Sequence, residues 1–224
     1  MSVAAPPPDS PPAQDPSDLD PLAILTTDQA YSQLGRSLLL TDLDGDGETD
    51  LLVSAPGLRG CVHILYSYRT RLPVLASIPS LADTTLCGEE GGGGRFGASI
   101  AVLDLNSDGV VDLAVGEPYT GAKSLQYQGC VRVYWGVSSP GNYSLRPGPA
   151  LSCVETPCGL GAALAAEPGG GLVVGAPWTG RGGRQRGAVV RLGPGLDWED
   201  REYTVPGDLD WTLSGRSVSK YHKV

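Results

Sequence analysis

The feature that most constrains the fold of this chain is an internal repeat. Asp42 recurs as Asp104, and Pro56 recurs at the same interval as Pro118. A third copy keeps the equivalent turn at Pro177, and a fourth copy begins near Leu213. A unit that recurs at a fixed period is one supersecondary structure, which buries its apolar faces only by stacking on its neighbours. The repeat therefore predicts an architecture of stacked, similar units.

Each copy supplies about four short strand candidates, separated by turns rich in Gly, Pro and Asp. In the second copy the candidates span residues 98–103, 113–116, 130–135 and 151–154, and the third of them alternates apolar and polar residues. Four short antiparallel strands form a propeller blade, and closed propellers have roughly 4–8 blades. We therefore expect an all-β fold, a partial β-propeller of about three four-stranded blades plus the start of a fourth, within a larger propeller.

The limits of the copies predict the organisation of the chain. Residues 1–21 combine many prolines and aspartates with no basic or apolar stretch, so we expect a disordered Pro-rich tail and not a signal peptide. The repeats then predict these units: blade 1 at residues 22–80, blade 2 at 81–156, blade 3 at 157–206, and the start of a truncated blade 4 at 207–224.

Composition excludes two classes of protein. A net charge of −9 argues against a general nucleic-acid binder, which needs cations to neutralise phosphates. No apolar run approaches the roughly 20 residues of a transmembrane helix. With one Phe and one Met, the core must be built from Val, Leu, Ala and Tyr. Neither a nucleic-acid partner nor a transmembrane segment is expected.

Oxygen-bearing side chains recur at positions one, three, five and nine of a loop in the first two copies. They are Asp42, Asp44, Asp46 and Asp50 in the first copy, and Asp104, Asn106, Asp108 and Asp112 in the second. A hard cation such as Ca²⁺ takes several oxygen ligands, which alternate residues of a tight loop can supply. The backbone carbonyls of Glu48 and Val110 are the expected seventh-position ligands. In the third copy this loop has decayed to residues 167–171.

Two calcium sites are therefore predicted. The alternative is a plain Asp/Gly hairpin turn without a metal. An EF-hand is excluded, because its twelfth position is a Glu beside helices, whereas here that position is Val53 or Val115 inside a strand candidate. A bound cation would also neutralise the repulsion within each cluster of carboxylates.

Catalysis by this chain alone is not expected. A multi-zinc phosphodiesterase centre needs several converging imidazoles, and the chain has only His63 and His222. His63 falls in a strand candidate and is interpreted as a half-exposed structural residue. Residues 92–97 match a Gly-rich phosphate loop in form, but a strand follows where a helix is required.

The five cysteines fit no zinc pattern and leave at least one cysteine outside any intramolecular pair. Cys153 and Cys158 are close enough to bridge a small loop, while Cys61, Cys87 and Cys130 stand alone in sequence. The sequon that begins at Asn142 would mark an exposed loop in a secreted chain.

Two further features of the sequence each allow two interpretations. The Gly-rich segment with Arg181, Arg184 and Arg186 could clasp an anionic headgroup or glycan, although a solvated loop is the preferred interpretation. Tyr119 and Trp178 occupy equivalent positions after their Pro turns and could contact a partner. Packing on the neighbouring blade is the preferred interpretation of this aromatic pair.

Several of these motifs carry a family resemblance. Phe96-Gly97, the aspartate loop and Gly116-Glu117-Pro118 resemble the FG-GAP repeat of integrin alpha-chain propellers. The segments 125–134, 151–158, 193–196 and 211–213 resemble the C-terminal propeller of the glycosylphosphatidylinositol-specific phospholipase D family. This second likeness covers roughly residues 22–218 of the chain.

The resemblance implies a calcium-binding propeller segment of a secreted protein that hydrolyses the inositol–phosphate linkage of GPI anchors. In that family the catalytic zinc ions lie in a separate N-terminal domain, which this chain lacks. The implied partners are the missing blades, that catalytic domain, and a GPI-anchored protein or glycan. The alternatives are an extracellular adhesion propeller of integrin alpha type, or a non-functional product, truncated or alternatively spliced.

Overall fold

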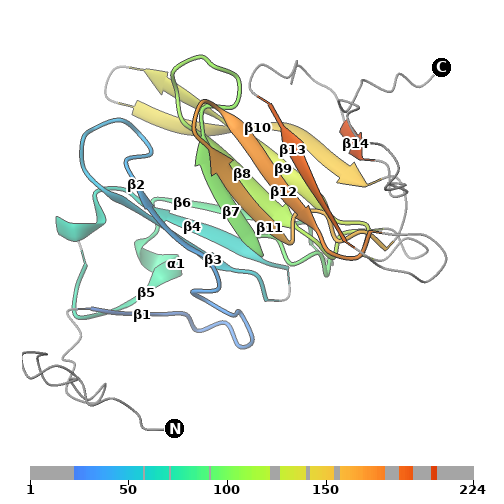
Figure 1. The fold of residues 1–224 in the computed structure, drawn as a ribbon. Helices are drawn as coiled ribbons and strands as arrows, with labels where there is room; N and C mark the ends of the chain where they lie inside the picture. Colours follow the sequence, from blue (N-terminus) through green and yellow to red (C-terminus); the bar gives the residue numbers. More distant parts are fainter. Residues whose placement is uncertain are drawn as a thin grey trace, which may run out of the picture.

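The computed structural model describes the chain at residues 23–57, 59–70, 72–90, 92–121, 127–139, 142–153, 157–179, 187–193 and 203–205. Strands dominate these residues, and the helical elements among them are the short helix α1 (Ile78–Leu81) and the 3₁₀ helix η2 (Tyr68–Thr70). Three separate sheets form from successive copies of the repeat (Figure 1). The predicted all-β, partial-propeller fold is confirmed.

The first sheet is antiparallel and has the order β2-β3-β4-β6. Its strands are β2 (Leu38–Thr41), β3 (Asp50–Ala55), β4 (Cys61–Leu65) and β6 (Thr84–Cys87). The aspartate loop of the first copy joins β2 to β3. The fourth strand of this sheet lies beyond residue 80, the limit that the repeats predict for the first unit.

The second sheet is built on the second copy and has the order β14-β10-β9-β8-β7. Its strands are β7 (Ser99–Leu103), β8 (Asp112–Glu117), β9 (Cys130–Ser139), β10 (Asn142–Cys153) and β14 (Tyr203–Val205). The β9–β10 hairpin is longer than expected, because pairing continues to Ser139 and Asn142. The register shifts between Pro147 and Ala150, where proline cannot donate to the ladder.

The third sheet has three strands among the described residues, in the antiparallel order β11-β12-β13. They are β11 (Ala163–Glu167), β12 (Gly171–Ala176) and β13 (Ala188–Leu192). A tight turn at Gly169 and Gly170 replaces the aspartate loop between β11 and β12, and both glycines have positive φ angles. Strand β14, which the repeats assign to this unit, pairs in parallel with β10 of the second sheet.

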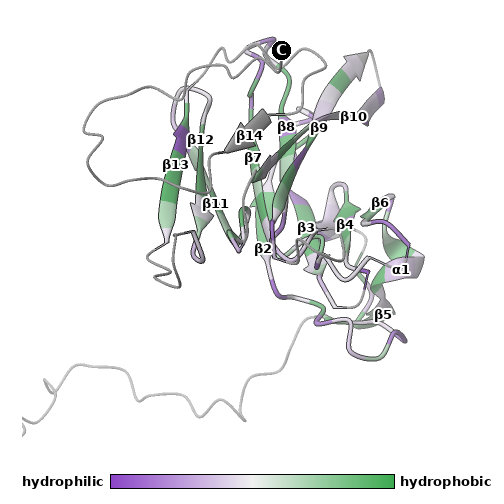
Figure 2. Cartoon of the chain, turned by 90° about the vertical axis from the view of Figure 1, so that its right-hand side faces the viewer, coloured by the Kyte–Doolittle hydropathy of each residue, from purple (hydrophilic) through white to green (hydrophobic). Residues whose placement is uncertain are grey.

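The three sheets lie side by side with the second in the middle (Figure 2). One core fills the space between the first and second sheets and includes Leu52, Ile64 and Leu113. Another joins the second and third sheets through Val131 and Leu172. Each face of the second sheet is therefore buried against a neighbour, as the stacking of repeats requires.

The outer face of the first sheet is covered by elements that the strand pattern did not predict. The parallel pair β1 (Ile24–Thr26) and β5 (Leu75–Ser77) lies beside α1. Ile78 of α1 is fully buried against Leu51 and Val53 of β3. This small cluster forms a third core and shields one face of β3 from water.

The junctions between sheets repeat a side-chain contact. The Ser37 hydroxyl donates to the Ala98 carbonyl at 3.2 Å, and the Ser99 hydroxyl donates to the Gly161 carbonyl at 2.7 Å. At the second junction the backbones approach closely, since a Cβ on Gly116 would collide with the Gly161 carbonyl. Glycine at position 116 thus allows the second and third sheets to meet.

Two disulfides connect elements within the repeats. Cys61 and Cys87 face each other across β4 and β6, and Cys153 bonds to Cys158 after the end of β10. The second bridge matches the short-loop pairing considered from sequence. Cys130 lies buried in β9 and belongs to neither bridge. No helix among the described residues is long and apolar enough to span a membrane.

Candidate metal centre

The two aspartate loops occupy the same position in neighbouring sheets, between the first and second strands of each copy. Figure 1 shows both loops at the same end of the stack. Gly45, Gly47 and Gly109 have φ angles between 80° and 87°, a conformation that glycine adopts without the Cβ penalty. These glycines let each loop reverse direction within a few residues.

In the first loop the aspartates accept hydrogen bonds from the loop backbone. The two carboxylate oxygens of Asp42 accept from Gly45 N at 2.8 Å and from Gly47 N at 3.0 Å. Asp44 Oδ1 accepts from Asp46 N at 3.1 Å, and Asp46 Oδ1 accepts from Glu48 N at 2.7 Å. Side chains at alternate positions are thereby turned towards the centre of the loop.

Asp50, at the ninth position, anchors this loop to the sheet. Its side chain is fully buried, and its carboxylate accepts from Leu43 N at 2.7 Å and from Ser67 N at 2.8 Å. Burial raises the pKa of Asp50 above its usual value, and the two backbone hydrogen bonds act against that rise. A cation beside Asp50 would favour the ionised carboxylate.

The carboxylates of the first loop converge. Oxygen atoms of Asp42, Asp44 and Asp50 all lie within 4.8 Å of one another. Asp46 is placed differently, because its Oδ2 accepts a hydrogen bond from the Ser67 hydroxyl at 3.0 Å. The structure thus brings three of the four predicted aspartates into one cluster and ties the fourth to the turn after β4.

The second loop repeats the backbone pattern with a different third position. Asp104 accepts from Asp108 N at 3.1 Å and from Gly109 N at 2.9 Å, and Asp108 Oδ1 accepts from Val110 N at 2.8 Å. Asn106 accepts from Asp108 N through Oδ1, and its Nδ2 donates to Asp108 Oδ2 at 2.8 Å. Where the first loop has a carboxylate, the second has an amide that supplies both an acceptor and a donor.

Asp112 is the buried anchor of the second loop. Its carboxylate accepts from Leu105 N at 2.9 Å and from Gly136 N at 2.8 Å, the same pattern as at Asp50. Burial raises the pKa of Asp112 to about 6. Among the described residues, the acidic side chains of this loop do not form a trio as close as the one in the first loop.

The chemistry of the donor set fits a hard divalent cation. Every predicted side-chain ligand is an oxygen, as Ca²⁺ requires. None of the ion pairs among the described residues involves a loop aspartate, so no described Lys or Arg neutralises the cluster. The fit is stronger for the first loop, where three carboxylates converge. The roles of the Glu48 and Val110 carbonyls stay predictions.

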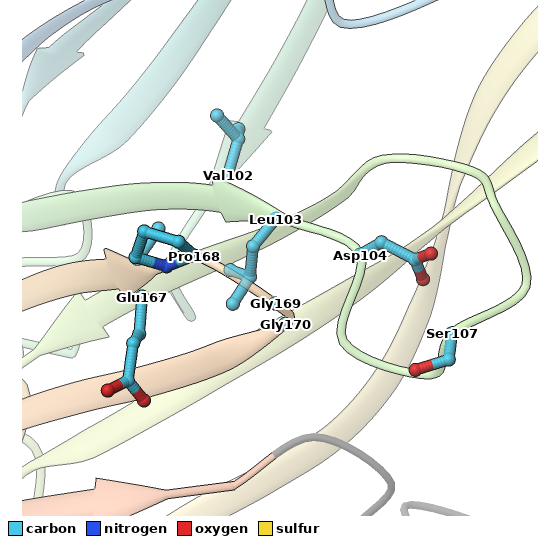
Figure 3. Close-up of a pocket in the computed structure, with 9 residues that line it drawn as sticks. Val102, Leu103, Asp104, Ser107, Glu167, Pro168, Gly169 and Gly170 are labelled. Atoms are coloured by element: carbon cyan, nitrogen blue, oxygen red, sulfur yellow. The ribbon is translucent and has the colours of Figure 1, made fainter.

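A groove borders the second loop. It has a volume of about 530 Å³ and lies between Asp104 and Ser107 on one side and the turn at residues 167–170 on the other (Figure 3). Glu167 is bound by Arg191 through Nη2 at 2.7 Å, which holds this carboxylate in the third sheet. The groove leaves one side of the second loop open to solvent.

The other residues singled out from the sequence either pack within the fold or lie outside the described residues. His63 is 6% exposed, more buried than expected from sequence, and its Nδ1 lies 3.0 Å from the Thr85 hydroxyl. The rings of Tyr119 and Trp178 meet edge to face at 5.2 Å, so the predicted packing between neighbouring copies is confirmed. His222 and the arginines at 181, 184 and 186 lie outside the described residues.

Sequence reasoning missed the second anchor of each loop. Ser67 and Gly136 donate backbone N–H groups to the ninth-position aspartates, although neither belongs to the loop motif. The available signal was their equivalent position one residue after the end of the Cys61–Tyr66 and Cys130–Trp135 segments. A backbone donor leaves no residue-type signature, so the spacing of aspartates alone could not reveal it.

Comparison with known proteins agrees with this geometry. Residues 34–65 and 96–134 match the FG-GAP repeat, and each match contains one aspartate loop. Over 208 residues, the chain is 38% identical to phosphatidylinositol-glycan-specific phospholipase D from Rattus norvegicus and, equally, to the protein of that name from Homo sapiens. Over 157 residues it is 37% identical to integrin alpha-IIb from Mus musculus. The resemblance inferred from the motifs is confirmed.

The extent of these likenesses differs. The alignments to the two phospholipases cover 87% of this chain and 24% of each relative, so the chain spans about a quarter of their length. The alignment to integrin alpha-IIb covers 64% of the chain and 14% of that protein. The shared part is therefore more than half of this chain and only a minor share of each relative.

Proposed function

We propose that this chain, whose first two sheets are FG-GAP repeats, is a calcium-binding propeller segment of a phosphatidylinositol-glycan-specific phospholipase D-like protein. Its two loops hold one Ca²⁺ each, and the ions order the loops against the sheets. In the first loop the ligands are Asp42, Asp44, Asp46, the Glu48 carbonyl and Asp50. In the second they are Asp104, Asn106, Asp108, the Val110 carbonyl and Asp112.

The convergence of Asp42, Asp44 and Asp50 is the observation that carries this proposal. Three carboxylates within 4.8 Å repel one another unless a cation lies among them. Asp50 is also fully buried, and burying an ionised carboxylate is costly unless it is paired or binds a metal. Calcium supplies the compensating positive charge and accepts oxygen ligands alone.

We place the parent protein outside the cell. Cys61–Cys87 and Cys153–Cys158 are disulfides, which persist in oxidising compartments and are rare in the cytosol. Asn142 of the sequon is exposed at the start of β10, where a glycan could be attached. Both features support a secreted glycoprotein, as the family resemblance implied.

The role we assign to the segment is structural support and not catalysis. The parent activity is hydrolysis of the inositol–phosphate linkage of GPI anchors, with zinc held in another part of the protein. His63, the imidazole among the described residues, is buried and lies beside the Thr85 hydroxyl, which supports this division of labour. The partners we propose are further blades, the catalytic domain, and a GPI-anchored protein or glycan.

An adhesion propeller of integrin alpha type is the second candidate. It is favoured by the 37% identity to integrin alpha-IIb. The similarity to the phospholipases extends over more of the chain, 87% against 64%, and so favours the first candidate. Both candidates share the calcium loops.

Calorimetric titration of the chain with Ca²⁺ tests the shared claim. We expect two bound ions per chain for the wild type and one for Asp42→Asn/Asp44→Asn, because that variant loses two carboxylates from one cluster. Asp28→Asn controls for the loss of an acidic side chain elsewhere, since Asp28 is exposed and lies outside both loops. Binding no tighter than millimolar in the wild type, or an unchanged stoichiometry in the loop variant, would refute the proposal.

A further inference from the structure

We propose that Ser67 is a positioning residue that strengthens calcium binding at the first loop. This inference rests on the proposed calcium function and concerns a residue outside the aspartate motif. Ser67 holds two loop aspartates at once, whereas its equivalent in the second copy, Gly136, holds one.

Ser67 lies in the turn after β4 and contacts the loop through two different groups. Its backbone N–H donates to Asp50 Oδ1 at 2.8 Å, and its hydroxyl donates to Asp46 Oδ2 at 3.0 Å. The other oxygen of Asp46 accepts from Glu48 N at 2.7 Å. The Asp46 carboxylate is therefore fixed from both sides before any ion binds, and less rotational entropy is lost on binding.

The second copy has no room for the same arrangement. A Cβ on Gly136 would collide with the carbonyl oxygen of Val111 and would lie 2.8 Å from the Val110 side chain. The Tyr143 hydroxyl also donates to the Val111 carbonyl at 2.7 Å, which keeps that carbonyl in place. Position 136 accordingly keeps the backbone donor and lacks a hydroxyl.

In the second loop the side chain of Asn106 holds Asp108, the aspartate at the fifth position. Its Nδ2 donates to Asp108 Oδ2 at 2.8 Å. This solution replaces one carboxylate by a neutral amide, so the loop offers three carboxylates instead of four. Calcium affinity rises with ligand charge, and the fourth carboxylate favours the first loop.

Calcium calorimetry on Ser67→Gly isolates the contribution of the hydroxyl. Ser67 has a φ of 47°, a region that glycine tolerates, so the variant keeps the backbone N–H and removes only the side chain. We expect the first site to weaken about tenfold, typical for loss of a group that orients a metal ligand. The second site should stay unchanged, and the unfolding midpoint in EDTA should not fall, because glycine adopts this φ without strain.

Ser107→Gly is the matched control. It is the same substitution at a positive φ of 64°, within the second loop, and the Ser107 hydroxyl binds no aspartate among the described residues. It should leave both affinities within about twofold of the wild type. Ser67→Ala serves as a second variant that also lacks the hydroxyl, should Ser67→Gly fold poorly.

The outcomes separate this inference from the calcium proposal. Selective weakening of the first site, with a midpoint in EDTA no lower than that of the wild type, supports Ser67 as a positioning residue. Wild-type affinities in both Ser67 variants, or equal weakening of both sites together with a lower midpoint, overturn the inference and leave the calcium proposal standing. A wild-type chain that binds no calcium overturns both.

Discussion

At the scale of single residues, Asp50 and Asp112 connect the loops to the sheets. Each carboxylate accepts one backbone N–H from the start of its loop and another from further along the chain, from Ser67 after β4 or from Gly136 within β9. Both side chains are fully buried, so the loops are anchored within the fold and are not exposed appendages. Loss of either anchor would leave buried N–H groups without an acceptor.

His63 gives a pH-dependent prediction at the same scale. Burial lowers the pKa of His63 below its usual value of 6.5. The unfolded chain binds the proton near pH 6.5 while the folded chain does not, so His63 should reduce stability as the pH falls below 6.5. We expect the wild type to lose more free energy of unfolding than His63→Asn between pH 7.5 and pH 5.5, measured by urea denaturation in EDTA.

The asparagine variant keeps a polar atom near the Thr85 hydroxyl and does not titrate in this range. Other titrating groups are common to both proteins, so their contribution cancels in the comparison. Parallel pH profiles for the two proteins would contradict the assignment of a neutral, buried imidazole.

The spacing of Asp and Asn predicted four converging side chains in the first copy, and the structure brings Asp42, Asp44 and Asp50 within 4.8 Å of one another. It did not show that Asp46 turns to Ser67, nor that Asn106 donates to Asp108. These contacts depend on the turn after the third strand and on the rotamer of one amide. Neither contact follows from a repeated residue pattern, so the sequence could not predict them.

At the scale of elements, the Cys61–Cys87 disulfide fixes the outer pair of strands in the first sheet. The bridge spans 26 residues, including β5 and α1, whereas Cys153–Cys158 spans only five. A cross-link constrains the unfolded chain more when it closes a longer loop. The cover that β5 and α1 form over the first sheet therefore depends on this bridge.

We expect Cys61→Ser/Cys87→Ser to lower the free energy of unfolding by about 3.5 kcal/mol, and Cys153→Ser/Cys158→Ser by about 2 kcal/mol. Urea denaturation of both variants and the wild type, in the same calcium buffer, measures the two losses. The reverse order of losses would contradict the loop-closure account.

Alternation and turn residues predicted the central strands of each copy. They placed β7 and β8 within a residue or two of the observed bounds. They missed the extension of the β9–β10 hairpin, because Pro147 and Pro149 normally argue against a strand. The structure accommodates Pro147 at a register shift, on a stretch of β10 that pairs only with β9 among the described strands.

At the scale of the whole molecule, the internal repeat predicted the order of the three sheets and the burial of the middle one. It did not predict the cover of β1, β5 and α1 over the first sheet, which has no counterpart among the described residues of the second copy. Repetition predicts what the copies share, whereas such additions depend on contacts that occur once. The predicted limits of the four units stay predictions.

The most direct test of the calcium-dependent fold is thermal unfolding of the chain in EDTA and then in millimolar Ca²⁺. A ligand that binds only the folded state raises its stability by about 2.7 kcal/mol per site at a concentration 100 times its dissociation constant. We expect one cooperative transition whose midpoint rises when calcium is added. The same midpoint in both buffers would contradict it.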